Sequence, residues 1–212
     1  MAALCLESGR LKICGDPEPM KLEPIVHFCE EKEVVAIAID APLTAALSDS
    51  RGKRSSDNEL SNLLPRGSKW VMSVNSMMAV PVRGQLLAEA LSPIVGTILE
   101  THPRACLFFA AGTSSELREA VAKYKYQDKD KDKVLEAKSC VAQLWRMWTK
   151  LFGIQSKKSQ DSHDALDALV CATVAYLYHL KPETLTKLVH KALKRYGRGP
   201  FIVLSPDVGK GV

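Results

Sequence analysis

Residues Val34 to Leu43 form the sequence VVAIAIDAPL, an apolar run that ends in Asp40 and Pro42. An apolar run without polar alternation predicts a strand that is buried on both faces of a sheet. A carboxylate inside such a strand would lose its hydration. We therefore expect Asp40 at the carboxyl end of the strand, where ligands bind in open α/β sheets. The alternative is that Asp40 only begins a turn, because Asp before Ala-Pro is common in turns.

The composition is that of a folded protein with a mild basic bias. The chain has 212 residues, of which 46% are hydrophobic and 25% charged, values that exclude global disorder. Its net charge of +5 is compatible with a nucleic-acid partner but is not diagnostic of one. The length suits one domain over residues 1–212, with a loose tail expected at residues 205–212.

The cysteines and the apolar segments predict the compartment. None of the six cysteines forms a C-x-x-C pair, so we expect reduced thiols in a cytoplasmic protein. The N-terminus lacks the pattern of a signal peptide. The longest apolar stretch, Ala165 to Leu180, is too short for a membrane span and contains Asp167. We therefore expect no membrane association.

Periodicity and turn residues predict the other elements of the chain. They are a hairpin within residues 2–14, strands at 94–100 and 201–204, and helices at 22–31, 57–64, 84–91, 115–126, 134–152, 162–180 and 182–197. Trp145 and Trp148 lie on the apolar stripe of their helix, which indicates packing rather than nucleotide stacking. The order of elements predicts an α/β fold with a mixed sheet flanked by helices.

Two basic segments are candidates for contact with nucleic acid. Residues 123–133 read KYKYQDKDKDK, which is typical of a solvated loop, and a contact through Lys123 and Lys125 is the alternative. The helix expected at 182–197 carries a basic outer face, formed by Lys187, Lys191, Lys194 and Arg195.

Acidic residues recur where buried elements are expected to reach the surface. Glu100 ends the second apolar strand, as Asp40 ends the first. Asp164 and Asp167 lie at i, i+3 and share one face at the start of a buried helix. A divalent cation would relieve the repulsion between these two carboxylates, and Mg²⁺ or Mn²⁺ are the ions that such oxygens bind in phosphoryl-transfer sites. The alternative is ordinary helix capping.

Two histidines lie next to these acids. His102 follows Glu100 and precedes Pro103, so a polar role at the strand end competes with a purely structural one. His163 lies beside Asp164 near the expected helix cap, where it is expected to be exposed.

Four short motifs occur together in this order. They are I-D-A-P-L at residues 39–43, an Arg-rich stretch with Asp57, E-x-H-P at residues 100–103, and H-D-A-L-D-A-L at residues 163–169. With these motifs the chain resembles the domain-of-unknown-function 429 family, whose members are predicted nucleases with a ribonuclease-H-like fold. The resemblance covers nearly the whole chain. It implies that Asp40 and Asp167 are metal ligands, and that Glu100 and Asp164 are ligands or supporting acids.

The chain departs from the family pattern at its beginning. The pattern opens with a strand that bears G-x-D, and residues 1–4 correspond to the strand after it. The resemblance therefore implies that one strand and one acid are lacking. Three explanations are a start codon assigned late, an inactive copy, and a shift of residues 2–6 into the vacant position, of which we favour the first.

The resemblance and the acids together predict a function. We expect a nuclease that hydrolyses nucleic acid with Mg²⁺ or Mn²⁺ through Asp40, Glu100, Asp164 and Asp167, with an inactive copy of such a nuclease as a variant of this expectation. The alternative is a non-catalytic protein that binds nucleic acid or acts as a scaffold. A nucleotide phosphotransferase is disfavoured, because Gly52-Lys53 lacks the other residues of a phosphate-binding loop.

Overall fold

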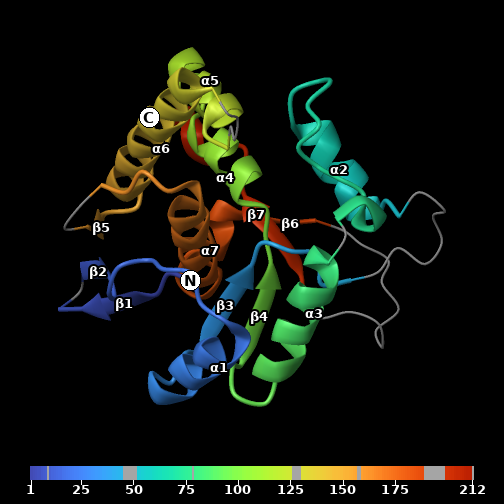
Figure 1. The fold of residues 1–212 in the computed structure, drawn as a ribbon, viewed down its shortest axis with the longest axis vertical. Helices are drawn as coiled ribbons and strands as arrows, with labels where there is room; N and C mark the ends of the chain where they lie inside the picture. The colour runs from blue at the N-terminus through green and yellow to red at the C-terminus, as the bar shows by residue number, and fades with distance from the viewer. Residues whose placement is uncertain are drawn as a thin grey trace. The chain divides into compact units, whose positions relative to one another are not determined.

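The computed structural model describes residues 1–8, 10–44, 52–77, 79–125, 130–156, 159–188 and 199–211 (Figure 1). Its contacts divide the chain into two compact units where the sequence predicts one domain. Unit 1 comprises Met1–Pro19, Pro103–Thr173 and Leu204–Val212, and unit 2 comprises Met20–His102 and Val174–Val203.

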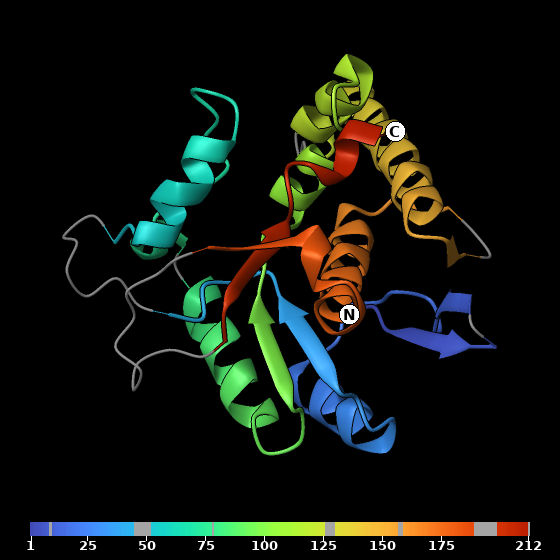
Figure 2. The ribbon, with the colours of Figure 1, turned by 180° about the vertical axis from the view of Figure 1, so that it is seen from behind.

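The sheet of unit 2 is built from the apolar strands that the sequence predicts. Its order is β3-β4-β7-β6, in which β3 is Ala36–Ile39, β4 is Thr97–Glu100, β7 is Phe201–Leu204 and β6 is Leu185–Leu188. Strand β4 is parallel to both β3 and β7, as the adjacent arrows in Figure 2 show. The carboxyl ends of β3 and β4 therefore lie side by side, and β7 begins beside the last residue of β4.

Helices α1 (Leu22–Glu31) and α3 (Val80–Leu91) lie beside β3 and β4 (Figure 1). Cys29 and Leu91 from these helices are buried in a cluster that Ile37 and Ile98 of the strands also contact. This packing explains why the strands are apolar on that face. Helix α2 (Ser55–Leu63) follows in the same unit.

Unit 1 begins with the expected hairpin. Strands β1 (Leu4–Glu7) and β2 (Arg10–Ile13) pair antiparallel, and the short β5 (Ile154–Gln155) pairs parallel with β2. A disulfide joins Cys5 and Cys14, so the prediction of six reduced thiols is wrong for this pair. The reason is the strand register: Cys5 lies opposite Lys12, and Cys14 is on the same face two residues further.

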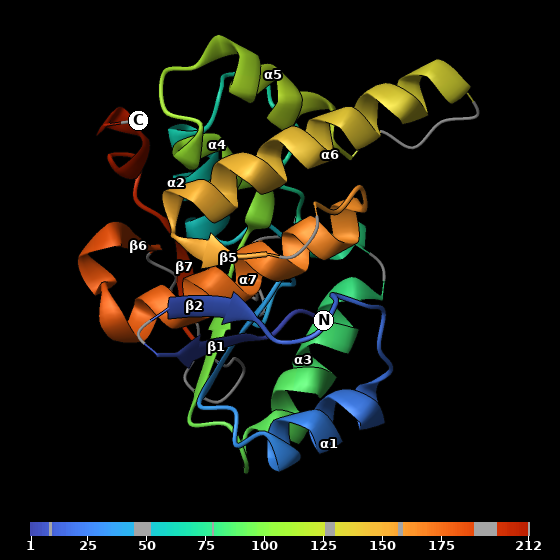
Figure 3. The same cartoon turned by 90° about the vertical axis from the view of Figure 1, so that its left-hand side faces the viewer.

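The helices of unit 1 are α4 (Pro103–Ala110), α5 (Ser115–Lys123) and α6 (Lys131–Leu151), of which α5 and α6 are adjacent in Figure 3. Trp145 and Trp148 of α6 are almost completely buried. The indole Nε1 of Trp148 donates to Oγ1 of Thr173 at 2.9 Å. The prediction that both tryptophans pack in the core is confirmed.

Helix α7 (His163–Leu180) passes from unit 1 into unit 2 along the chain. Leu166, Leu169, Val170 and Val174 on it are fully buried, as its apolar sequence predicts. In the described part of the chain, no helix has the length and apolar character needed to cross a membrane.

The C-terminal region differs from the prediction. In place of a helix from residue 182, the 3₁₀ turn η2 (Pro182–Thr184) leads into β6, where Leu188 is completely buried. Pairing in a sheet overrides the helical spacing here. Residues 189–198, including Lys191, Lys194 and Arg195, lie outside the described residues.

The segment expected to be a loose tail contains the 3₁₀ turn η3 (Val208–Gly211), which contacts α4. Gly209 and Gly112 approach so closely that a Cβ on either glycine would overlap the other's backbone. The described residues of this segment therefore lie against α4, and the expectation of a loose tail stays a prediction.

A further 3₁₀ turn, η1, spans Val74–Met77 in unit 2. With helices beside both parallel and antiparallel strands, the fold is α/β, as the sequence predicts. The layout is consistent with a ribonuclease-H-like fold, although the described strands form two sheets rather than one.

Candidate functional site

Asp40 directly follows the last paired residue of β3. Ile39 lies opposite Glu100 in the parallel register, and the backbone N–H of Thr101 donates to the carbonyl of Ile39 at 3.0 Å. Asp40 itself is exposed. An exposed acid at the carboxyl end of parallel strands has the position that ligand-binding acids take in α/β sheets.

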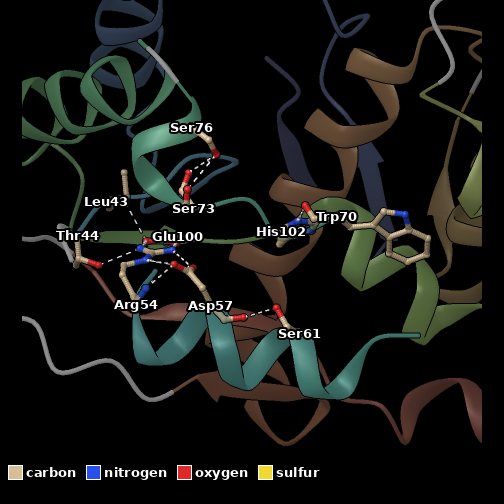
Figure 4. A network of polar contacts seen from close by, with 10 residues as sticks. All are labelled: Leu43, Thr44, Arg54, Asp57, Ser61, Trp70, Ser73, Ser76, Glu100 and His102. Atoms are coloured by element: carbon tan, nitrogen blue, oxygen red, sulfur yellow. Dashed lines mark hydrogen bonds and ion pairs between the residues drawn. The ribbon is translucent and has the colours of Figure 1, made fainter. Parts of the chain in front are cut away.

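Glu100 ends β4 and is buried in a polar network (Figure 4). Its Oε2 accepts the backbone N–H of Leu43 at 2.8 Å and Nη1 of Arg54 at 2.8 Å. Its Oε1 accepts Nη2 of Arg54 at 2.5 Å. Both oxygens of this carboxylate are therefore engaged by donors of the protein.

Arg54 is the centre of the network. Its guanidinium donates to both oxygens of Asp57, with Nη2 to Oδ1 the shortest of these bonds at 2.6 Å, and Nη1 also donates to Oγ1 of Thr44 at 2.9 Å. Together with the bonds to Glu100, these contacts occupy all five N–H groups of the guanidinium. The ring of Phe201 lies 5.4 Å from the guanidinium carbon.

Burial and charge determine the protonation of this network. Burial alone would lower the pKa of Arg54, but the hydrogen bonds to Glu100 and Asp57 overcome this effect and raise it. Burial raises the pKa of Glu100 above its ordinary value, even though Arg54 opposes this shift. Two buried carboxylates, Glu100 and Asp57, share one buried cation. Arg54 therefore stabilises the ionised form of Glu100 less than it would if Glu100 were its single partner.

The N-terminal end of α7 holds the other two predicted acids. Ser162 precedes the helix, and its hydroxyl accepts the backbone N–H of Ala165 at 3.4 Å, in agreement with a capping role. Asp164 is highly exposed, with Oδ1 3.4 Å from Nε2 of His163. His163 is partly buried rather than exposed, which departs from the prediction.

Asp167 is buried and holds partners on both oxygens. Oδ1 accepts the hydroxyl of Tyr124 at 2.8 Å, and Oδ2 lies 2.6 Å from Nζ of Lys125. The guanidinium of Arg104 and the ammonium of Lys125 each lie 5.7 Å from the ring of Tyr124. Lys125 therefore contacts an acid of its own unit.

His102 follows Glu100 and Thr101 at the end of β4. Its Nε2 lies 3.1 Å from the backbone carbonyl of Trp70, which fits a proton on that nitrogen. This contact ties residue 70 to the strand end (Figure 4). The hydrogen bond agrees with the structural alternative for His102.

The four predicted acids fall into two pairs. Asp40 and Glu100 belong to unit 2, and Asp164 and Asp167 belong to unit 1. Ile39 and Glu100 are opposite one another, so unit 2 brings its two acids to one strand end. Within the described residues, no three or more His, Cys, Asp or Glu side chains form a group that could hold a metal ion.

The donors differ in how well they suit Mg²⁺ or Mn²⁺, which bind carboxylate oxygens. Glu100 fits poorly as a ligand, because a divalent ion at its oxygens would meet the positive charge of Arg54. Asp40 fits, since it is exposed. Asp167 fits if Lys125, whose side chain is one-third exposed, moves aside for the ion.

Sequence reasoning missed the buried partners of these acids. The signal for one of them was present, because Arg54 and Asp57 stand at i, i+3 where a helix begins. Tyr124 and Thr44 carried no recognisable signal, since each meets its partner only through the folded chain.

These features define an α/β protein with acids at the carboxyl end of its parallel strands and at the start of a late helix. The chain belongs to the family described as "Protein of unknown function (DUF429)", whose sequence profile matches residues 2–191. Searches among curated proteins and among solved structures gave no significant match.

Proposed function

We propose that this protein is a nuclease that hydrolyses phosphodiester bonds in nucleic acid and depends on Mg²⁺ or Mn²⁺. The observation that carries the proposal is the exposed carboxylate of Asp40, one residue beyond β3 and next to the end of the parallel strand β4. Oxygen ligands at such a strand end suit hard divalent cations.

Each acid has a role in this proposal. Asp40 in unit 2 and Asp167 in unit 1 are each proposed as ligands of a metal ion, and Asp164, which is exposed one turn from Asp167, supports the acid of its own unit. The sequence leaves two roles open for Glu100, metal ligand or supporting acid. We assign it the second role, because its oxygens already accept hydrogen bonds from Arg54 and Leu43. When bound, the ion would make water a better nucleophile and stabilise charge on the leaving oxygen.

The charge of the protein and its cysteines bear on its substrate and its compartment. The net charge of +5 favours approach to phosphate groups. We assign the protein to the cytoplasm. The four cysteines outside the disulfide, Cys29, Cys106, Cys140 and Cys171, agree with this assignment, whereas the Cys5–Cys14 disulfide is unusual in that compartment.

Cleavage of labelled single- and double-stranded DNA and RNA, with Mn²⁺ or with a chelator, tests the proposal. We expect metal-dependent cleavage that falls by about 100-fold or more in Asp40→Asn and in Asp167→Asn. Asp16→Asn is the matched control, because Asp16 is an exposed acid in a loop. A folded protein that cleaves none of these substrates with Mn²⁺ would refute the proposal.

A second candidate is a protein that binds nucleic acid without cleaving it. It is favoured by the fact that Glu100 and Asp167 already have cationic partners, Arg54 and Lys125. This candidate predicts salt-dependent binding that survives the double variant Asp40→Asn/Asp167→Asn. Loss of metal-dependent cleavage in either single variant would exclude it.

A further inference from the structure

We infer that Glu100 and Arg54 are positioning residues that hold Asp40 in place through the backbone of Leu43. The inference rests on the proposed function, in which Asp40 binds the metal. It assigns Glu100 and Arg54 to the support of that acid rather than to contact with the ion.

The first step is the short loop that carries Asp40. At its start, the carbonyl of Ile39 accepts the N–H of Thr101 at 3.0 Å. At its end, the N–H of Leu43 donates to Oε2 of Glu100 at 2.8 Å. The loop is therefore fastened at both ends, to Thr101 directly after β4 and to Glu100, its last residue, and only three residues lie between the fastened points.

The second step is the burial of the hydrogen bond between Leu43 and Glu100 at the end of the loop. Leu43 is 1% exposed and Glu100 is 2% exposed, so water cannot replace the hydrogen bond between them without opening the structure. The carboxylate must remain where the N–H of Leu43 points. Otherwise a buried donor loses its partner.

The third step is the control of Glu100 by Arg54. The guanidinium holds each oxygen of Glu100 with a separate N–H, which fixes the plane of the carboxylate. Its other groups are anchored on Asp57, at the start of α2, and on Thr44, next to Leu43. Arg54 thus sets the orientation of Glu100 from outside the strand.

Lysine cannot perform this task. Its ammonium is a point charge without the planar fork that reaches Glu100, Asp57 and Thr44 at once. A glutamine at residue 100 also fails, because its one acceptor oxygen would face three donors: Nη1 and Nη2 of Arg54 and the N–H of Leu43. Arg54→Lys and Glu100→Gln are therefore the two informative variants.

Amide hydrogen exchange followed by NMR, without metal, tests the attachment itself. In both variants we expect the Leu43 amide to exchange at least about tenfold faster than in the wild type. The Thr101 amide, bonded to Ile39, reports whether the strand pair remains intact and should change by less than about twofold. The Asp40 carboxyl ¹³C signal should shift in the same variants. Ser61→Ala, which removes a bond to the Asp57 carbonyl on α2, is the control.

Calorimetric titration with Mn²⁺ tests whether the hydrogen bond between Leu43 and Glu100 affects binding of the metal ion. We expect a dissociation constant about tenfold higher in Arg54→Lys and Glu100→Gln than in the wild type or in Ser61→Ala. An unchanged Leu43 amide, equal acceleration at Leu43 and Thr101, or an unchanged Mn²⁺ affinity would each overturn the inference. If the wild type binds no Mn²⁺, the proposed function fails, and the Leu43 exchange and the Asp40 signal still decide whether the residue is positioned in this way.

Discussion

The hydroxyl of Tyr124 donates a hydrogen bond of 2.8 Å to Oδ1 of Asp167, across 43 positions of the sequence. Tyr124 directly follows α5 and Asp167 lies near the start of α7, so this bond joins the end of α5 to the part of α7 that belongs to unit 1. With Lys125 on the other oxygen, it gives a buried acid two partners. The bond explains how an acid can lie in an apolar helix without a large loss of stability.

Replacement of Tyr124 by Phe removes this bond and keeps the ring. We expect the free energy of unfolding to fall by about 1–3 kcal/mol, because Asp167 stays buried with one donor fewer. Urea denaturation measures the change. Tyr176→Phe serves as the control, since no hydrogen bond from the Tyr176 hydroxyl joins it to the described residues. Equal effects of the two variants would contradict a role for the Tyr124 hydroxyl.

Replacement of Arg54 by Met leaves two buried carboxylates without their cation. We expect a loss of about 3–5 kcal/mol in the free energy of unfolding. The triple variant Arg54→Met/Glu100→Gln/Asp57→Asn removes the uncompensated charge and should recover most of that loss. Chemical denaturation compares the two proteins. A triple variant as unstable as the single one would mean that lost packing, rather than charge, dominates.

The raised pKa of Glu100 predicts a dependence of stability on pH. Because its folded-state pKa lies above the ordinary value of 4.5, the folded protein binds the proton more readily than the unfolded chain. Protonation of Glu100 therefore stabilises the folded protein. This contribution to the free energy of unfolding is fully present below pH 4.5 and is lost as the pH rises through the folded-state pKa. The wild type should therefore lose stability relative to Glu100→Gln as the pH rises through that window. Thermal unfolding of both proteins across this range gives the slope, and parallel curves would contradict the prediction.

The close approach of Gly112 and Gly209 predicts a strong effect of a single methyl group. A Cβ on Gly112 would lie 1.9 Å from the carbonyl oxygen of Gly209, and φ at this residue is +56°. Gly153 also has a left-handed φ, of +63°, but no atom lies within 4 Å of its added Cβ. Gly153→Ala should cost about 1–2 kcal/mol from backbone strain alone.

Gly112→Ala should cost clearly more than Gly153→Ala, because η3 must also move away from α4. Limited proteolysis should then cut the C-terminal segment faster in Gly112→Ala only. Similar melting temperatures for the two variants would show that η3 yields at little cost.

The sequence predicted the elements that are governed by local pattern. The apolar run before Asp40 contains β3, and the stripe that includes Trp145 and Trp148 is the buried face of α6. Both strands are shorter than the apolar runs that predict them. Residues 34 and 35 precede β3, and residues 94–96 precede β4. Periodicity indicates burial and does not by itself mark where pairing begins.

The remaining features depend on contacts between distant residues, which a single sequence does not contain. The short α4 was missed because its helical residues are apolar nearly throughout and give no amphipathic period. Strand β6 is set by its sheet neighbour, although the same residues have helical spacing.

The candidate site was predicted in part. Sequence alone identified acids at the ends of elements, but not the partners of Glu100 and Asp167. The hairpin that joins Cys5 to Cys14 was predicted as a hairpin, yet the pairing of the two thiols follows only from its register.

The buried position of Arg54 changes how the protein presents itself to a polyanion. In formal charges, the network encloses one cation with two anions, Glu100 and Asp57, none of which reaches the solvent. The rest of the chain is thus one unit more positive than the net charge of +5 suggests. Counterion release on binding to a phosphate backbone depends on the cations at the surface. The slope of affinity against salt concentration should therefore be unaffected by Arg54, although it is an arginine in a basic stretch of sequence.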